Sequence, residues 1–245
     1  MSKRLEGKTA LVTGGGSGIG LAIARAMAAE GCRVIICGRN EQKLREAAEA
    51  GHGEVALETR TVDVADRQSV EQLFGWVDKN LGQLDILVNN AGVNIANRKM
   101  AEMSPEDWDR ILAIVATGSY NCMRLALPPM RERGDGLIVN ISSVSGKRGS
   151  DLGGVGYSAA KFAQTALGTT VGLEVGPLGV RVTNIYPGEV DTPILKDRPQ
   201  PVTDEHRAKI LKPEDVAAAV LMVACLPARA HVPELVIKPT WQPYS

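Results

Sequence analysis

The sequence predicts a single α/β domain, 1–245, built on a doubly wound, mainly parallel sheet of seven strands. Short apolar runs alternate with helical patterns along the whole chain, which is typical of a parallel sheet with right-handed crossovers. The strand-like runs are continuously hydrophobic rather than alternating, as expected for strands that helices cover on both faces. A length of 245 residues suits one α/β domain.

The seven predicted strands are short and rich in β-forming residues. They lie at 9–13 ("TALVT"), 33–37 ("RVIIC"), 55–64 ("VALETRTVDV"), 84–89 ("LDILVN"), 136–142 ("GLIVNIS"), 180–186 ("VRVTNIY") and 234–238 ("ELVIK"). Helical patterns separate them at 18–30, 41–50, 66–81, 104–131, 157–176 and 213–226. The long fourth helix carries a start signal, with Ser104 as its cap, Pro105 at its first position and acids in its first turn.

The balance of charge argues against two classes of partner. Lys and Arg number 28, as do Asp and Glu, and no basic run is visible, so neither nucleic acid nor a membrane surface is expected. The N-terminus "MSKRLEGKTALVTG" lacks the pattern of a signal peptide, and no run approaches the roughly 20 apolar residues of a membrane span. Four cysteines in apolar contexts, without a C-x-x-C motif, are typical of a cytoplasmic protein. Three scattered histidines lack metal-ligand spacing, so no metal is expected.

A glycine-rich turn, "TGGGSGIG", stands directly between the first strand and the first helix. Gly14, Gly18 and Gly20 allow a sharp turn and let a pyrophosphate approach the helix N-terminus, where free N–H groups favour anions. Their spacing is G-x-x-x-G-x-G rather than G-x-G-x-x-G, so the turn alone is weak evidence. Its position between a strand and a helix indicates a dinucleotide.

The second strand ends at "ICGRN", where the NAD-type pattern would place an acid to hold the ribose hydroxyls. Arg39 stands in that region instead. An arginine can bind the 2′-phosphate of NADP, which an acid would repel, so the sequence favours NADP(H) and leaves NAD(H) open. The alternative is that Arg39 is a solvated side chain at the start of a helix.

Three further motifs follow the later strands. "NNAG" (89–92) comes after the fourth strand, "NISSVSG" (140–146) ends the fifth, and "YSAAK" places Tyr157 and Lys161 on one helix face. Together with "TGGGSGIG" and "YPGEVDTP", they occur in the order and spacing of the short-chain dehydrogenase/reductase family. The chain resembles this family over nearly its whole length, which implies a Rossmann-type fold.

The resemblance implies a role for each matching position. Tyr157 corresponds to the catalytic acid/base, Lys161 to the residue that binds the nicotinamide ribose and lowers the tyrosine pKa, and Ser143 to the serine that hydrogen-bonds the substrate oxygen. Together with Arg39, the expected cofactor-binding positions are Gly14, Ser17, Gly18, Ile19, Gly20, Asp63, Val64, Asn90, Ala91, Gly92, Tyr157, Lys161, Pro187, Gly188, Val190 and Thr192.

The spacing of Tyr157 and Lys161 has a physical reason. A free tyrosine has a pKa of about 10. A lysine charge at about 4 Å, in an effective dielectric of about 20, is worth about 4 kcal/mol. Such a charge would bring the tyrosine pKa to about 7, where the phenol can give or take a proton at neutral pH.

One position departs from the family pattern. The family commonly has an asparagine three residues before the glycine that matches Gly118, and this chain has Val115 there. In the family that asparagine helps to seat a water that passes protons from the lysine to solvent, and valine offers no polar atom. Three interpretations stay open: water reaches Lys161 through backbone carbonyls, turnover is slow or confined to unusual substrates, or the site binds a cofactor without turnover.

The Pro-rich stretch after the sixth strand is long for a βα connection, and such loops are usually functional lids or disordered segments. We expect a substrate loop at about 187–212, with a surface excursion as the alternative. The candidate substrate contacts are Ser143, Ser145, Glu189 and Ile194. Glu189 would disfavour a carboxylate or contact an amine or hydroxyl, unless it points to solvent.

These residues predict the reversible reduction of a ketone or aldehyde by NADP(H). Hydride would pass from the nicotinamide to the carbonyl carbon while Tyr157 gives the proton, Ser143 orients the oxygen and Lys161 tunes Tyr157. The alternative is a nucleotide-binding regulatory protein with weak or no turnover, which Val115 supports. The resemblance also implies a homodimer or homotetramer built on the two long helices.

Overall fold

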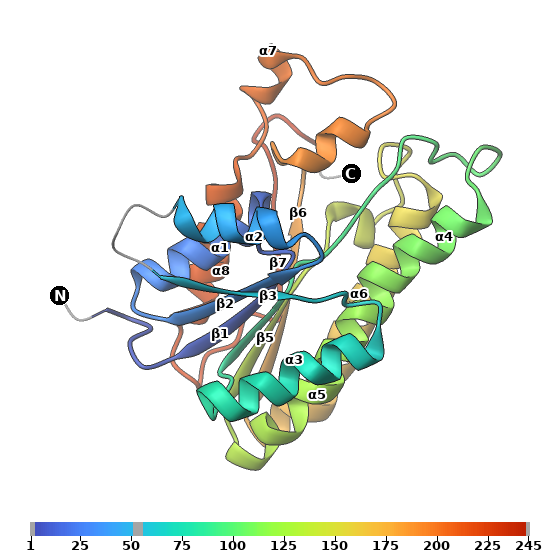
Figure 1. The fold of residues 1–245 in the computed structure, drawn as a ribbon. Coiled ribbons are helices and arrows are strands. Elements are labelled where there is room, and N and C mark those ends of the chain that lie inside the picture. The colour runs from blue at the N-terminus through green and yellow to red at the C-terminus, as the bar shows by residue number, and fades with distance from the viewer. Residues whose placement is uncertain (1–2, 51–55, 244–245) are drawn as a thin grey trace.

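The computed structural model describes residues 3–50 and 56–243. Seven strands form one sheet in the order β3-β2-β1-β4-β5-β6-β7, and the ladders between them are parallel. The predicted doubly wound, seven-stranded fold is therefore confirmed (Figure 1). The strands are β1 Thr9–Thr13, β2 Arg33–Gly38, β3 Leu57–Thr61, β4 Ile86–Asn89, β5 Gly136–Ile141, β6 Val180–Pro187 and β7 Glu234–Ile237.

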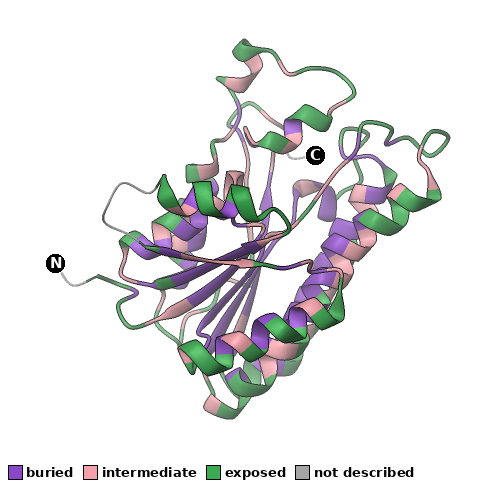
Figure 2. Ribbon diagram, in the orientation of Figure 1, coloured by how far each residue is buried: buried purple, intermediate pink, exposed green. Residues whose placement is uncertain are grey.

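Helices cover both faces of the sheet. The helices are α1 Gly18–Ala29, α2 Glu41–Glu49, α3 Arg67–Leu81, α4 Pro105–Leu112, α5 Gly118–Arg133, α6 Val155–Val175 and α8 Pro213–Ala224, and the short α7 Asp204–Arg207 lies beyond the edge of the sheet (Figure 1). Neighbouring strand residues point to opposite faces, so Val12 packs with α1, α2 and α8 while Leu11 packs with α3 and α5. Figure 2 shows the result, with buried strands between helices whose outer faces are exposed.

Several boundaries differ from those predicted from the sequence, including those of β3, α6 and the long helix. Strand β3 is shorter than 55–64, because the chain turns after Thr61 and Asp66 caps α3 by accepting from Gln68 N; residue 55 lies outside the described residues. Helix α6 begins at Val155 rather than at 157. The helix predicted at 104–131 contains a π-helical turn, Ala113–Thr117, between α4 and α5.

The π-helical turn, η1, lies where the long helix meets the sheet. A Cβ on Gly118, the first residue of α5, would lie 2.7 Å from Val64 Cγ2, so the helix packs closely against the chain that leaves β3. The run Pro105–Arg133 is long and apolar enough to cross a membrane by length and composition. Half of its most apolar window is buried inside the fold, a property that core helices share.

The strand order places a crevice at the carboxyl ends of β1 and β4. The chain runs outward from β1 through β2 to β3, and then crosses to β4 on the other side of β1. Ligands of doubly wound sheets bind at such a switch point. The stretch after β6 rises beyond this edge (Figure 1), contains the 3₁₀ turn Pro193–Asp197 and helix α7, and is closed at its base by a bridge between Val190 and Leu211.

Candidate active site

A cavity of about 650 Å³ lies at the carboxyl edge of the sheet. Its walls come from the loops after β1, β4, β5 and β6 and from the first turns of α6, so segments far apart in the sequence meet there. The predicted site residues that line it are Gly14, Ser17, Gly18, Ile19, Asn90, Gly92, Ser143, Ser145, Tyr157, Lys161, Pro187, Gly188, Glu189, Val190, Thr192 and Ile194.

The glycine turn between β1 and α1 has no room for a side chain at Gly14 or Gly20. Gly14 has a φ of +65°, and a Cβ there would lie 3.0 Å from both Ala91 Cα and Asn90 Nδ2. A Cβ on Gly20 would overlap Asn90 Nδ2 and the carbonyl oxygen of Gly14. Glycine is favoured where φ is positive or backbones approach closely. These residues let the turn pack directly against the loop after β4.

Hydrogen bonds tie the loop after β4 to the end of β1. Asn90 Nδ2 donates to the carbonyl oxygens of Thr13, at 2.9 Å, and Gly14, at 3.2 Å. The backbone N–H groups of Asn90 and Ala91 both donate to Thr13 Oγ1 at 3.0 Å. Thr13, a residue that the sequence analysis missed, therefore fixes one wall of the cavity from behind it.

Ser143, Tyr157 and Lys161 converge on the cavity from two elements. Ser143 is the second residue after β5 and caps a 3₁₀ turn, where its Oγ accepts from Ser145 N at 3.1 Å. Tyr157 and Lys161 lie near the start of α6, four residues apart, so both side chains leave one face of the helix. The Ser143 side chain also lowers the pKa of Tyr157, so the two side chains are neighbours in the cavity. The structure thus groups these side chains as the motif spacing indicates.

The environment of Tyr157 corrects one expectation. Burial raises the pKa of Tyr157, because a buried phenolate loses its hydration. The hydrogen bond with Ser143 and the charge of Arg98 lower it, but they offset only part of the rise. The expected fall of this pKa to about 7 is wrong for this structure. Lys161 Nζ lies 5.7 Å from the centre of the tyrosine ring and makes its hydrogen bonds elsewhere.

Lys161 is itself the strongly perturbed group. It is 3% exposed, and burial lowers its pKa to about 7, because a buried ammonium group loses its hydration. Its Nζ donates to the carbonyl oxygen of Ile141 at 2.6 Å and to Gln164 Oε1 at 3.0 Å. If Gly92 carried a Cβ, that atom would be 3.8 Å from Lys161 Nζ and 3.8 Å from Val115 Cγ2. The side chains of Lys161 and Val115 therefore both border Gly92, and the one at 115 is apolar.

Gln164 supplies the polar side-chain contact to Lys161, and the sequence analysis missed it. It stands three residues after Lys161 in "YSAAKFAQTALG", among small and apolar residues. A polar side chain in such a run was the signal that could have found it, because positions three apart lie on one helix face.

Glu189 is turned inward, with its side chain 12% exposed, so the alternative of a solvent-directed side chain is wrong. Its Oε2 accepts from Arg198 Nη2 at 2.9 Å and pairs with His206 Nε2 at 2.7 Å. Burial alone would raise the pKa of Glu189, but the hydrogen bonds from His206 and Arg198 outweigh it and lower the pKa. The carboxylate is therefore already paired within the stretch after β6.

The remaining predicted cofactor positions lie outside the cavity wall: Gly20, Arg39, Asp63, Val64 and Ala91. Arg39 is exposed directly after β2. Asp63 Oδ1 accepts from Ala65 N at 3.0 Å, within the turn that follows β3. Lys43, on the first turn of α2, does line the cavity, although the sequence analysis did not single it out.

Arg98 is a second cavity residue that the sequence analysis missed. It is 5% exposed, and its guanidinium donates to the carbonyl oxygens of Ile95 at 2.8 Å, Leu152 at 2.6 Å and Asp197 at 2.6 Å. These carbonyls belong to the segments after β4, before α6 and after β6. No local motif marks Arg98, because its partners lie far from it in the sequence.

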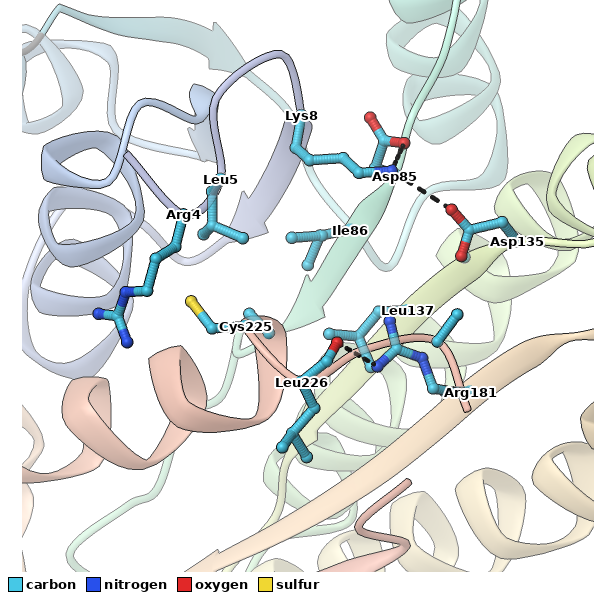
Figure 3. Close-up of a pocket in the computed structure, with 13 residues that line it drawn as sticks. Arg4, Leu5, Lys8, Asp85, Ile86, Asp135, Leu137, Arg181, Cys225 and Leu226 are labelled. Atoms are coloured by element: carbon cyan, nitrogen blue, oxygen red, sulfur yellow. Dashed lines mark hydrogen bonds and ion pairs between the residues drawn. The ribbon is translucent and has the colours of Figure 1, made fainter. Parts of the chain in front are cut away.

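A smaller cavity, of about 220 Å³, lies at the opposite edge of the sheet (Figure 3). Lys8 Nζ bridges Asp85 Oδ1 at 3.0 Å and Asp135 Oδ2 at 3.3 Å, and Arg181 Nη1 donates to the carbonyl oxygen of Leu226 at 3.3 Å. None of the predicted site residues lines this cavity. Its paired charges connect the amino ends of the strands and favour a structural role.

Comparisons with known proteins identify the family of this chain. The family model described as short chain dehydrogenase matches residues 8–202. An uncharacterized oxidoreductase of Staphylococcus saprophyticus is 35% identical over 237 residues, which cover 96% of this chain and 98% of that protein.

An alcohol dehydrogenase from the archaeon Thermococcus sibiricus, complexed with 5-hydroxy-NADP, has a TM-score of 0.86 and 30% identity, with 96% of this chain and 98% of that chain covered. The closed form of a serine dehydrogenase complexed with NADP+ has a TM-score of 0.86 and 31% identity, with 97% of each chain covered. The chain therefore belongs to the short-chain dehydrogenase/reductase family of oxidoreductases.

Proposed function

We propose that this oxidoreductase catalyses the NADP(H)-dependent, reversible reduction of a ketone or aldehyde to an alcohol. The observation that carries the proposal is the convergence of Ser143, Tyr157 and Lys161 on one cavity that the glycine turn also borders. A phenol that can give a proton, a hydroxyl that can orient an oxygen and a buried amine are thereby combined with a turn suited to phosphates.

The residues present fit a dinucleotide. A Cβ on Gly14 would press against the loop after β4, so glycine lets the turn lie close to that loop. Ser17 caps α1 without a hydrogen bond from its side chain to the helix, so its hydroxyl and the first N–H groups of α1 suit a pyrophosphate. Arg39 and Lys43 offer cations beyond β2, where the adenosine ribose of such cofactors binds. Their charge and the NADP-type ligands of both solved neighbours support NADP(H) over NAD(H).

The bound nicotinamide would supply or accept the hydride. The chain's own residues handle the oxygen and the proton: Ser143 orients the carbonyl oxygen, and Tyr157 gives the proton that completes the alcohol. The raised pKa of Tyr157 keeps its phenol protonated at neutral pH, as an acid requires. Lys161, when charged, stabilises the phenolate that remains.

The stretch after β6 would exclude water from this reaction. It brings Glu189, Thr192 and Ile194 to the cavity, and Arg98 holds the carbonyl of Asp197 against the opposite wall. Loops that cover an active site commonly sequester the substrate. We therefore retain 187–212 as the substrate loop, with Ser143, Ser145, Glu189 and Ile194 as the proposed substrate contacts.

A regulatory protein with weak or no turnover is the second candidate. The apolar Val115, which borders Gly92 as Lys161 does, is the observation that favours it. The polar contacts of Lys161 with Ile141 and Gln164 weigh against it, because they hold the amine without a polar residue at 115.

We further propose that the chain assembles as a homodimer or homotetramer in the cytoplasm. The outer faces of α4, α5 and α6 carry large exposed hydrophobic residues, namely Trp108 at 37%, Tyr120 at 45%, Phe162 at 43% and Leu173 at 76%. Exposed apolar residues of this size are common at protein interfaces. Light scattering of the purified protein tests the assembly, and a monomeric mass would contradict it.

The function is tested by following NADPH oxidation with a mixed panel of ketones and aldehydes, with NADH in parallel. Tyr157→Phe is the control, because it keeps the ring and removes the proton. Turnover that falls by at least about 100-fold in this variant would support the reductase. Binding of NADPH without turnover of any carbonyl, or of alcohols in reverse, would favour the regulatory protein.

A further inference from the structure

Gln164 is a buried amide three residues beyond Lys161 on α6, and it is 0% exposed. Its Oε1 lies 3.0 Å from Lys161 Nζ. Its Nε2 lies 2.8 Å from Ser119 Oγ on α5 and 3.4 Å from the carbonyl oxygen of Asn89 at the end of β4. One amide therefore joins the lysine to a second helix and to the sheet.

The neighbours of Gln164 determine which end of its amide faces the lysine. The carbonyl oxygen of Asn89 can only accept a hydrogen bond. Ser119 Oγ donates to the carbonyl oxygen of Val115 at 2.7 Å, so it accepts from Gln164. The amide nitrogen must face these two acceptors, and the amide oxygen must face Lys161 Nζ. An acceptor in this place favours the charged form of the lysine.

We propose that Gln164 is a positioning residue for the acid–base pair of Tyr157 and Lys161, and that it provides the polar contact that Val115 cannot. The proposal rests on the proposed carbonyl reduction, because the position of the lysine matters to catalysis only if Tyr157 exchanges a proton. Ile141 and Gln164 accept two of the three hydrogens of the ammonium group, which leaves the third for a group in the cavity.

The hydrogen-bonded chain explains how an apolar residue at 115 is tolerated. It runs from Lys161 through Gln164 and Ser119 to the carbonyl oxygen of Val115. The π-helical turn is therefore still joined to the lysine, through its backbone rather than through the side chain at 115. Gln164 lies on the same helix as Lys161, so the distance between the two side chains is set within α6.

Few charged groups lie where they could change the protonation of Lys161. Within residues 3–50 and 56–243, no carboxylate forms an ion pair with it. Tyr157 is the titratable neighbour on the same helix, at 5.7 Å from Nζ to the ring centre. Arg98, in the segment after β4, acts on Tyr157. Strand β5 contributes the carbonyl of Ile141, and the π-helical turn contributes an apolar side chain.

The first test measures Lys161 itself, in the full-length protein without cofactor. Lysine labelled with ¹³C at Cε reports the protonation of each amine by NMR, and the loss of one resonance in Lys161→Met identifies Lys161. Gln164→Met keeps the length of the side chain and removes its hydrogen-bonding atoms. We expect the acid dissociation constant of Lys161 to rise about tenfold in Gln164→Met, because the charged amine loses an acceptor. An unchanged titration would overturn the proposal.

Asn184→Leu is the matched control for this titration. Asn184 is also buried, at 1% exposed, and its amide accepts from Asn140 Nδ2 at 3.0 Å and donates to Thr165 and Thr169. The substitution removes a buried amide of the core that does not contact Lys161. We expect a loss of stability like that of Gln164→Met, with the Lys161 titration unchanged. An equal change in both variants would indicate a general effect of weakened packing and would overturn the positioning role.

The second test follows alcohol oxidation as a function of pH. We expect kcat of Gln164→Met to fall about 10- to 100-fold, with KM changed by less than about twofold, because substrate contacts remain. The acidic limb of the profile should move to higher pH, since a less charged Lys161 stabilises the phenolate less. Restoring an amide with Val115→Asn in the Gln164→Met background should recover part of kcat. A uniform fall at every pH without recovery would mean that Gln164 only fills space.

Turnover of the unmodified protein separates this proposal from the proposed function. If the protein reduces carbonyls and Tyr157→Phe abolishes the reaction while Gln164→Met changes neither profile nor titration, the positioning role fails alone. If the unmodified protein turns over no substrate in either direction, the proposed function fails and the catalytic role of Gln164 fails with it. If the double variant does not fold, the titration of Gln164→Met still decides.

Discussion

Arg98 Nη2 donates to the carbonyl oxygen of Asp197 at 2.6 Å, so a residue after β4 holds a turn that lies 99 residues further along the chain. The same guanidinium also binds the carbonyls of Ile95 and Leu152. Burial lowers the pKa of Arg98, and the neighbouring Arg198 lowers it further, while Asp197 and Tyr157 raise it. Arg98 therefore fastens the substrate loop to the cavity by charge-assisted hydrogen bonds rather than by a salt bridge.

Replacing Arg98 with methionine should loosen the substrate loop. The variant loses the donors to three carbonyls, and hydrogen bonds to charged groups contribute about 1.5–3 kcal/mol each, so we expect unfolding to become easier by about 2–4 kcal/mol after relaxation. Hydrogen exchange should accelerate in 193–198, and KM for the carbonyl should rise about tenfold. Protection of 193–198 equal to that of the unmodified protein would show that the guanidinium does not hold this turn.

Lys161 should make the stability of the cofactor-free protein depend on pH. Its pKa is lowered from 10.5 to about 7 in the folded state. Between these values the unfolded chain binds a proton that the folded chain does not, so stability falls as pH decreases from about 10.5 to about 7 and then levels off. Lys161→Met removes this contribution.

Urea unfolding at two alkaline pH values measures the contribution of Lys161. Between pH values of about 7.5 and 9.5, we expect the unmodified protein to gain about 2 kcal/mol relative to Lys161→Met, because each pKa step is worth about 1.4 kcal/mol. The other titrating groups are the same in both proteins, so their effects cancel when the two pH dependences of the unfolding free energy are subtracted. Parallel pH dependences of the two proteins would mean that Lys161 stays charged in the folded state.

Lys43 and Arg39 should select the phosphorylated cofactor. Replacing either with alanine should weaken NADPH binding about tenfold and change NADH binding by less than about twofold, because only NADPH carries the 2′-phosphate. Fluorescence titration of the reduced nucleotides measures both. Arg45→Ala on the same helix is the control, since its guanidinium is 62% exposed and pairs with Glu41. Equal losses for both nucleotides would assign these cations to the shared part of the cofactor.

Glu189 should stabilise the substrate loop at neutral pH and lose this effect in acid. Its pKa is below the ordinary value of 4.5 because the hydrogen bonds from His206 and Arg198 outweigh burial. Its stabilisation is therefore complete above 4.5 and disappears as pH falls through the lowered pKa.

Glu189→Gln tests this pH dependence. We expect a loss of about 1–2 kcal/mol at neutral pH, since a charged acceptor is removed from two donors, and a smaller difference in acid. Thermal unfolding across pH measures it. Glu205→Gln, at a carboxyl that is 81% exposed in the same stretch, is the control. A loss that persists unchanged in acid would attribute the effect of Glu189→Gln to packing rather than to charge.

The sequence alone determined the doubly wound fold class, the glycine turn and the placement of Tyr157 and Lys161 on one helix face. These features depend on short-range patterns: continuous apolar runs, a turn next to a helix start, and side chains four residues apart on one helix face. Ser143 is assigned through the family resemblance. The structure places it two residues after the end of β5, at the edge where parallel strands bring their carboxyl ends together.

The tertiary structure decided what surrounds those residues. Arg98 reaches Leu152 and Asp197 across three loops, and Gln164 meets Ser119 from a helix 45 residues away, so neither contact has a local pattern. Burial, which depends on the whole fold, raises the pKa of Tyr157 and lowers that of Lys161. A spacing of four residues fixes which side chains share a face, but packing fixes their dielectric surroundings and hydrogen-bond partners.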